Sequence, residues 1–409
     1  MKPDNSTSSL AHRFTVDGST DLERALLDFC TDVGKKIASI VPPDRLQGVL
    51  LGGGYGRGEG GVLRVADGTD APYNDLEYFV LNSGPVLLSE REFRDDIDAL
   101  GHRLSDVIGI EVEFKIISAE KLRSSPASMF YYDLVCGNYP VSGEPGLLSG
   151  CDHHRKAEDI PLHEGTRLLF NRCSGLLFAK ERLAAASPNQ DDLDFVGRNI
   201  AKAKLALGDV VLTALGRYHW SCRERHQRLL ETGGEELALP LERITGWHAE
   251  GVTFKLHPTT KSGNWDELSK QHGGLVETAW EVWRWVEQRR LGTSFSTPVE
   301  YAEAPGTKFP ELPAWRNALV RAKDRGVVVR VLIDCVGARY SKENMVARLK
   351  EVGIEAASFL PTSGFSSRRF SNLRNHRKIL VVDGCIGFTG GTNIREAHCL
   401  NLDPEAPTQ

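Results

Sequence analysis

The stretch from Asn375 to Asn393 gathers side chains that could act on a phosphodiester. His376 and Lys378 are two positions apart, so both side chains would leave the same face of a strand. Asp383 completes an HxKxxxxD spacing ahead of a Gly-Gly-Thr-Asn turn. A neutral imidazole can attack phosphorus and divide one displacement into two easier steps. A lysine ammonium can stabilise the charge that grows on the phosphate oxygens, so the pattern indicates phosphodiester chemistry.

This spacing resembles the HKD motif of the phospholipase D superfamily. The resemblance implies that His376 is the nucleophile and that Lys378 lies against the phosphate oxygens. It also implies that Asp383 hydrogen-bonds a histidine and stabilises its charged form, and that this site needs no metal or other cofactor. The implied substrate-binding residues are Asn393, Gly390 and Gly391. The alternative is a structural strand and turn whose histidine and lysine are surface residues.

The surrounding residues, about 298–400, look like the first half of a bacterial cardiolipin synthase. An apolar run to Asp334, a helical stretch over 343–352 and an apolar run over 353–361 predict a strand, a helix and a strand, and 379–382 predicts a further, buried strand. Left-handed helix ends are expected at Gly326 and Gly353. Such enzymes move a phosphatidyl group between lipid alcohols. The resemblance therefore implies a phospholipid or another phosphodiester as substrate, and no specific nucleic acid is expected.

Two departures from the family pattern bear on activity. Family active sites use two facing HKD motifs, one histidine attacking and the other serving as general acid, whereas this sequence holds one. His154 and Lys156 repeat the HxK spacing, but Pro161 stands where the aspartate belongs, so we interpret this stretch as a charged loop. Upstream, residues 309–315 run almost directly into an expected helix over 316–325, without the strand that family members place before it. We therefore expect a half domain that homodimerisation completes or that is inactive.

A second group of residues, near the other end of the chain, also indicates phosphoryl chemistry. The glycine-rich turn that contains Gly53 and Gly54 would let backbone N–H groups cradle a triphosphate. Asp75 and Glu77 are two positions apart on an expected strand, so their carboxylates share one face. Paired carboxylates of this kind bind Mg²⁺ or Mn²⁺, and two such ions can clamp an in-line displacement.

This second pattern resembles the nucleotidyltransferase fold of the polymerase β superfamily. The resemblance implies a third carboxylate from a later strand, for which residues 109–117 offer Glu111 and Glu113, and we favour Glu113. It also implies Mg²⁺ or Mn²⁺ with a nucleoside triphosphate, bound by the glycine turn and Arg57. The alternative is a folded relic, or a module that only binds nucleotides.

Composition is that of a globular protein: 409 residues, 41% hydrophobic, with a formal charge of −5. The eight cysteines show no metal-binding spacing and are expected as reduced thiols of a cytoplasmic protein. The start of the chain is polar, and no apolar stretch is long enough to span a membrane. Arg368 to Lys378 holds five cations and no acid, which favours an anionic substrate or peripheral contact with the inner membrane face.

We therefore predict an α/β (α+β) protein of three parts: a mixed-sheet nucleotidyltransferase-like domain (20–150), a helical bundle (160–290) and one phospholipase-D-like α/β half domain (298–400). Helical spacing over 167–178, 199–215 and 277–290 indicates the bundle, and a polar linker is expected at 292–298. The leading functional prediction is phosphodiester transfer or hydrolysis through a phosphohistidine, most like phosphatidyl transfer in cardiolipin synthesis. Metal-dependent nucleotidyl transfer is the alternative, and a non-catalytic composite is the third.

Overall fold

The computed structural model describes residues 12–304 with short gaps at 66–67, 85, 185–188, 234–236 and 260–263. Beyond residue 304 it describes residues 319, 323, 326–334, 345–351, 353–359, 378–382 and 386–390. The chain divides into two compact units, residues 1–306 and residues 307–409. We describe each unit by itself.

The first unit is built on a four-stranded mixed sheet with strand order β5-β4-β1-β6. β4 and β5 run parallel, whereas β1 runs antiparallel to both of its neighbours. The central strands form because their apolar runs are buried on both faces, as residues 49–51 and 78–81 are. The strands span Leu46–Leu51 (β1), Leu76–Asn82 (β4), Val112–Ser118 (β5) and Tyr139–Gly143 (β6). The mixed α and β class predicted from the sequence is confirmed.

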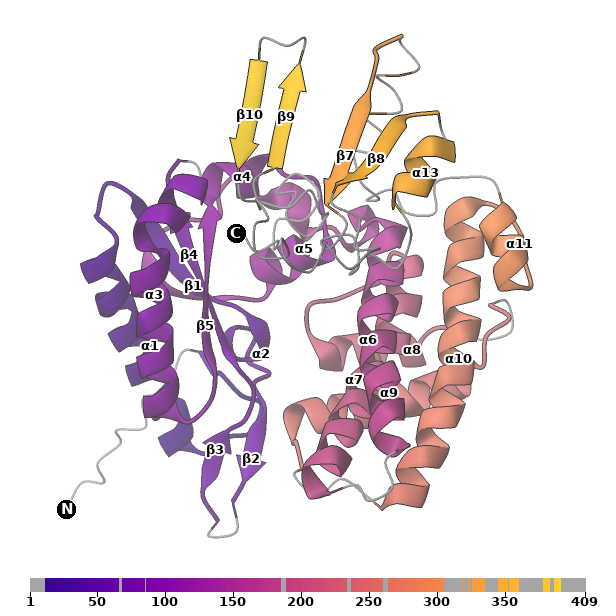
Figure 1. Cartoon of the computed structure of the whole chain (residues 1–409). Helices are drawn as coiled ribbons and strands as arrows, with labels where there is room; N and C mark the ends of the chain where they lie inside the picture. Colours follow the sequence, from indigo (N-terminus) through magenta and orange to yellow (C-terminus); the bar gives the residue numbers. More distant parts are fainter. Residues whose placement is uncertain are drawn as a thin grey trace, which may run out of the picture. The chain divides into compact units, whose positions relative to one another are not determined.

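Helices cover both faces of this sheet (Figure 1). α1 and α3 pack on one face, where Leu26 and Ile97 join the core. α4 and α5 pack on the other, where Leu122 and Leu134 meet Phe79 of β4. The covering helices are α1 (Thr20–Ile40), α3 (Val86–Ile108), α4 (Ala119–Ser124) and α5 (Met129–Cys136). Shorter elements are α2 (Gly53–Gly56), the hairpin of β2 (Val62–Arg64) with β3 (Asp70–Pro72), and 3₁₀ turns at Asp152–Arg155 and Ala157–Asp159.

The same unit continues into a helical bundle (Figure 1). Its helices are α6 (Leu162–Leu183), α7 (Gln190–Ala214), α8 (Cys222–Leu230), α9 (Leu241–Leu256), α10 (Trp265–Leu291) and α11 (Pro298–Glu303). Helix starts follow from side-chain caps: Asn189 and Asp192 form a capping box on α7, and Asn264 caps α10. Gly292 ends α10 with φ +64°. The helices predicted from apolar spacing fall on α6, α7 and α10.

Residues 292–298, predicted as a polar linker, contain a buried aromatic side chain. Phe295 is only 2% exposed, and its ring packs against Trp283 of α10 and Tyr301 of α11. These residues therefore fold onto the bundle. No helix in the described part of the chain is long and apolar enough to cross a membrane.

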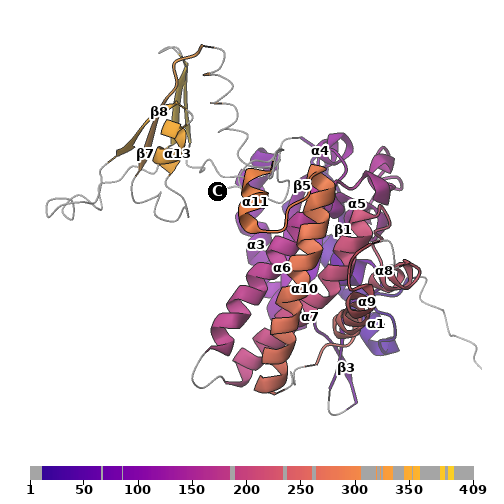
Figure 2. The same cartoon turned by 90° about the vertical axis from the view of Figure 1, so that its right-hand side faces the viewer.

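The second unit contains two small sheets. β7 (Arg330–Asp334) runs parallel to β8 (Glu355–Phe359), with α13 (Met345–Glu351) between them in the sequence and packed beside them (Figure 2). β9 (Lys378–Val382) runs antiparallel to β10 (Ile386–Gly390). Gly326 and Gly353 have φ of +89° and +75°, the left-handed backbone that was predicted for both. The predicted order of strand, helix, strand and strand is observed, while the helix expected over 316–325 lies largely outside the described residues.

The prediction that residues 379–382 form a buried strand is half right. The strand exists, but Ile379 is 66% exposed and Val381 is 61% exposed. Side chains two apart on a strand share a face. These two side chains of β9 therefore face solvent. The apolar run therefore predicted the strand correctly but did not predict its exposure.

Candidate functional site

The glycine turn after β1 lies directly against β4. The Gly52 N–H donates to the backbone oxygen of Glu77 at 2.9 Å. A Cβ on Gly52 would lie 2.4 Å from Cε2 of Phe79, and one on Gly53 would lie 2.5 Å from Oε2 of Glu77. Gly53 also has φ +59°, which a side chain disfavours. Glycine is needed at both positions because the backbone approaches the strand so closely.

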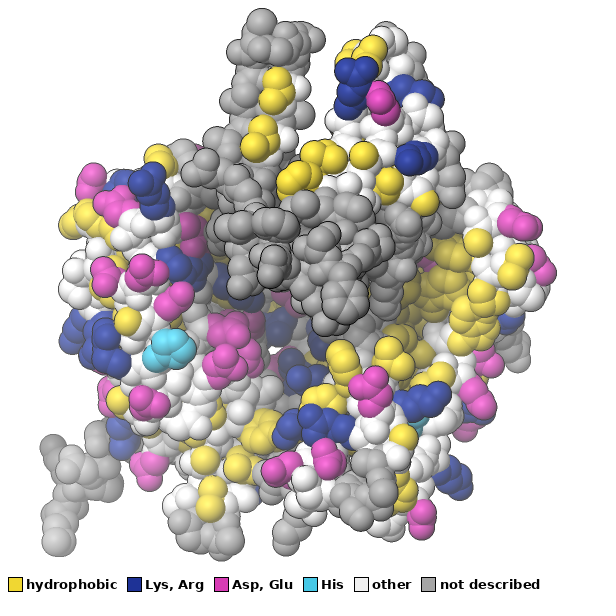
Figure 3. Space-filling view, viewed as in Figure 1, with side chains coloured by type: hydrophobic (Ala, Val, Ile, Leu, Met, Phe, Trp, Pro, Cys, Tyr) yellow, Lys and Arg dark blue, Asp and Glu magenta, His cyan; other side chains and the backbone are white. Residues whose placement is uncertain are grey.

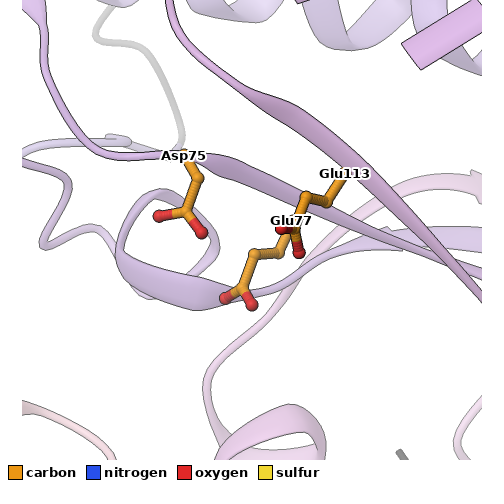
Figure 4. A group of neighbouring side chains, drawn as sticks. All are labelled: Asp75, Glu77 and Glu113. Atoms are coloured by element: carbon orange, nitrogen blue, oxygen red, sulfur yellow. The ribbon is translucent and has the colours of Figure 1, made fainter. Parts of the chain in front are cut away.

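Three carboxylates meet beside this turn (Figure 4). Parallel pairing of β4 with β5 places Glu77 in register with Glu113, and Asp75 lies just ahead of β4. One carboxylate oxygen from each of the three lies within 4.8 Å of the other two. This donor set suits a hard divalent cation, which prefers oxygen ligands. The structure thus brings together the three residues that the sequence analysis named as metal ligands, with Glu113 in the group as favoured.

Burial and the neighbouring carboxylates both raise pKa values in this cluster. Burial raises the pKa of Asp75, Glu77 raises it further, and Lys202 lowers it. Burial likewise raises the pKa of Glu113, with Lys115 lowering it and Asp75 raising it again. Negative groups held this close favour proton uptake, and a bound cation would relieve the same repulsion.

Lys115 is a site residue that the sequence analysis missed. Its Nζ lies 3.4 Å from Oε1 of Glu77 and 5.7 Å from the centre of the Phe79 ring. Lys115 is two residues after Glu113 on β5, so the alternation of side chains along a strand could have placed it on the same face.

Arg57 and Gly54, predicted as nucleotide contacts, are placed differently from Gly53. The Arg57 guanidinium is mostly buried and donates to Asp133 at 2.8 Å. A Cβ on Gly54 would face the backbone oxygen of Glu59 at 3.1 Å, not the carboxylate cluster. Of the three predicted nucleotide contacts, Gly53 touches the cluster. The roles given to Arg57 and Gly54 stay predictions.

Glu59 was not singled out in the sequence and links the turn to the bundle. Its carboxylate accepts hydrogen bonds from Oγ of Ser221 at 2.5 Å and from the backbone N–H of Cys222 at 2.8 Å. These groups form the N-terminal end of α8, where a negative charge is stabilised. Glu59 is 2% exposed, so the loop after the glycine turn is anchored to a helix far along the chain.

The bundle carries cations on the side that faces the carboxylates. Gly175 of α6 lies against Asn199 of α7, because a Cβ on it would meet the amide oxygen at 2.3 Å. Arg172 is one turn before that contact and Lys202 one turn after it, so these two cations are neighbours. Arg198 is one turn from Lys202 on α7. Figure 3 shows acidic and basic side chains on the two sides of a hollow between the sheet and the bundle.

Ion pairing distinguishes these three cations from Lys204, another lysine of the bundle. Among the residues that the structure describes, no carboxylate forms an ion pair with Arg172, Arg198 or Lys202. Partial burial and then Arg172 lower the pKa of Lys202, whereas Asp75 raises it. Lys204, in contrast, is paired with Glu250 at 2.5 Å and has a structural role.

The C-terminal motif is described only in part. Lys378 begins β9 and Gly390 ends β10, and the two are paired in register across the hairpin. The remaining motif residues, His376, Asp383, Gly391 and Asn393, lie outside the described residues.

The HxK stretch at 154–156, interpreted from the sequence as a charged loop, has exposed charged side chains at Arg155 and Lys156 but not at His154. His154 is fully buried in a 3₁₀ turn, and its Nε2 lies 2.8 Å from the backbone oxygen of Leu122. Its ring also packs against Tyr131. The histidine is therefore a core residue.

The family model that matches this chain lies within the second unit. Residues 308–405 match the family model described as "Cardiolipin synthase, PLD-like domain". This segment carries a phospholipase-D-like domain. The match includes the whole HxKxxxxD motif and the Gly-Gly-Thr-Asn turn, so the resemblance stated from the residues alone is confirmed for this part of the chain.

Curated relatives agree with the family model. Cardiolipin synthase 1 of Bacillus anthracis is 28% identical over 206 residues, covering 47% of this chain and 38% of the relative. Cardiolipin synthase 1 of Bacillus cereus is 34% identical with the same coverage. Cardiolipin synthase A of Pseudomonas fluorescens is 38% identical over 98 residues, covering 24% of this chain and 20% of the relative. The chain thus spans 38% of the length of the first two relatives.

Proposed function

We propose that the C-terminal unit catalyses phosphodiester transfer, of the phosphatidyl-transfer class, through a covalent intermediate on His376. The single observation that carries this proposal is the family match over residues 308–405, within which the motif keeps its full spacing. The pairing of Lys378 with Gly390 supports it, since the strand hairpin brings the start and the end of the motif side by side.

The proposed reaction has two displacements. His376 attacks phosphorus, a P–N bond forms, and the P–O bond to the first alcohol breaks as that alcohol takes up a proton from a general acid. A second alcohol, or water, then loses a proton and attacks phosphorus, the P–N bond breaks, and the imidazole is released. Lys378 and Asn393 would bind the non-bridging oxygens, where charge grows.

Turnover of an anionic phospholipid by the full chain, in buffer with EDTA, tests this proposal. His376→Ala should remove turnover, because a methyl group cannot replace an imidazole nucleophile. His163→Ala, which changes a histidine of α6 in the first unit, is the matched control and should keep it. Full turnover by His376→Ala would overturn the assignment.

We infer a second candidate function, metal-dependent nucleotidyl transfer in the first unit. The observation that favours it is the meeting of Asp75, Glu77 and Glu113 beside the turn at Gly53. These carboxylates would hold Mg²⁺, which supplies neutralisation of phosphate charge and orientation of the reacting oxygens. Lys202, with the neighbouring bundle arginines, would bind triphosphate charge from the opposite wall.

Calorimetry with a non-hydrolysable nucleoside triphosphate tests this second function. Mn²⁺ should raise the affinity of the full chain for the nucleotide, and Asp75→Asn should abolish that effect, because an amide is a poor ligand for a hard cation. Glu111→Gln is the matched control, since this residue lies beside the cluster but outside it. Nucleotide binding that does not depend on Mn²⁺ would contradict this function and favour the non-catalytic composite, the third possibility considered from the sequence.

A further inference from the structure

Lys115 lies inside the carboxylate site. It follows Glu113 by two positions on β5 and is in register with Phe79 of β4. The Phe79 ring, 3% exposed, underlies the Lys115 ammonium, which reaches Oε1 of Glu77 at 3.4 Å. Two contacts from the next strand therefore hold this cation beside the cluster.

One oxygen of Glu77 is already paired, and the other lies beside the glycine turn. Oε1 faces Lys115, and Oε2 lies against the turn, where a Cβ on Gly53 would be 2.5 Å away. A site for two divalent ions needs ligands that reach both ions, at a separation of about 3.5–4 Å. With one oxygen facing an ammonium, Glu77 has one other oxygen to offer a metal, which favours a single ion over a bridged pair.

The net charge of the site also favours one divalent ion over two. Before substrate binds, the three carboxylates and the Lys115 ammonium together carry two negative charges, which a single divalent cation neutralises. A second divalent ion would have to bind within a few ångströms of both the first ion and Lys115. Like charges at such separations repel strongly in a partly buried site.

We propose that Lys115 takes the place of a second metal ion: the site holds one divalent cation on Asp75, Glu77 and Glu113, and the Lys115 ammonium contacts a phosphate group of the substrate. This inference rests on the nucleotidyl-transfer function proposed above and departs from the two-ion expectation drawn from the sequence. It assigns Lys115 as a substrate-contacting residue.

The number of Mn²⁺ ions bound by the full chain, measured by electron paramagnetic resonance and calorimetry with a non-hydrolysable nucleoside triphosphate, tests the proposal. The wild-type chain should bind one ion. Lys115→Met should bind a second ion and should bind the first about tenfold more tightly, because a neighbouring positive charge is gone. Lys115→Arg should keep one ion, and Lys36→Met, which changes an exposed lysine of α1, should behave as wild type.

The outcomes separate this inference from the function on which it rests. Two ions in the wild-type chain would overturn the role of Lys115 and leave the nucleotidyl-transfer proposal standing. One ion in the wild type together with unchanged Mn²⁺ binding in Lys115→Met would also overturn the role of Lys115 and leave the nucleotidyl-transfer proposal standing. No Mn²⁺ binding by the wild-type chain would overturn both. A circular dichroism melt of each variant shows whether it is folded, and Lys115→Arg gives a second test if Lys115→Met is not.

Discussion

Gly53 and Glu77 are in such close contact that a side chain on the glycine would displace the carboxylate. A Cβ on Gly53 would lie 2.5 Å from Oε2 of Glu77, and the backbone at Gly53 has φ +59°. The conformation of the turn and the position of a proposed metal ligand are therefore coupled.

Gly53→Ala should accordingly abolish Mn²⁺ binding, because Glu77 must move, and should cost about 1–2 kcal/mol of stability from the left-handed backbone. Gly68→Ala is a matched control: Gly68 has φ +85°, but a Cβ there meets nothing within 4 Å. It should lose stability and keep metal binding. Equal Mn²⁺ titrations of the two variants would show that the contact with Glu77 is unimportant.

Glu59 should make stability depend on pH. Burial raises the pKa of this carboxyl, but hydrogen bonds from Ser221 and Cys222 outweigh it, so the pKa in the folded chain is lowered. A lowered folded pKa contributes stability above the unfolded value, about 4.3, and that contribution is lost as the pH falls through the folded value. Urea titrations of the wild type should show this loss below about pH 5.

Glu59→Gln should remove part of that dependence. At neutral pH the variant should be less stable by about 1–3 kcal/mol, because the end of α8 loses a charged acceptor. Glu144→Gln, an exposed position near β6, should match the wild type at every pH. A Glu59→Gln chain with wild-type stability at neutral pH would contradict the anchoring role.

Lys202→Met should weaken binding of a nucleoside triphosphate in the presence of Mg²⁺. A hydrogen bond to a charged group contributes about 1.5–3 kcal/mol, so the dissociation constant should rise at least tenfold. Lys180→Met, on an exposed part of α6, should leave it unchanged. Equal affinities for the two variants, measured by calorimetry, would show that Lys202 of the bundle does not bind the nucleotide.

The exposed apolar face of β9 gives the predicted homodimer a structural test. Ile379 and Val381 would be buried if a second copy packed on this face, and a two-fold axis brings identical surfaces together. Sedimentation of the full chain should show a dimer, and Ile379→Asp should shift it towards monomer. Val107→Asp, at an exposed position of α3, should have no effect. A wild-type chain that stays monomeric at all concentrations would refute the prediction.

Local rules explain what the sequence analysis could foresee. Alternation along a strand placed Asp75 and Glu77 on one face, the family resemblance implied Glu113 as the third carboxylate, and helical spacing predicted the long bundle helices. Partners far apart in the sequence were not foreseeable: Glu59 contacts the start of α8, and Arg57 contacts Asp133. The burial of Phe295 was not foreseen either, because it depends on how the flanking helices α10 and α11 bring Trp283 and Tyr301 against its ring.

The most direct measurement of the central claim is the mass of the chain after incubation with an anionic phospholipid in EDTA and a quench in base. The account predicts a phosphatidyl adduct that is stable in base, labile in acid and located on His376, and it predicts no adduct in His376→Ala. An adduct that persists in His376→Ala, or turnover that EDTA abolishes, would contradict the proposal that this chain transfers phosphodiesters through His376.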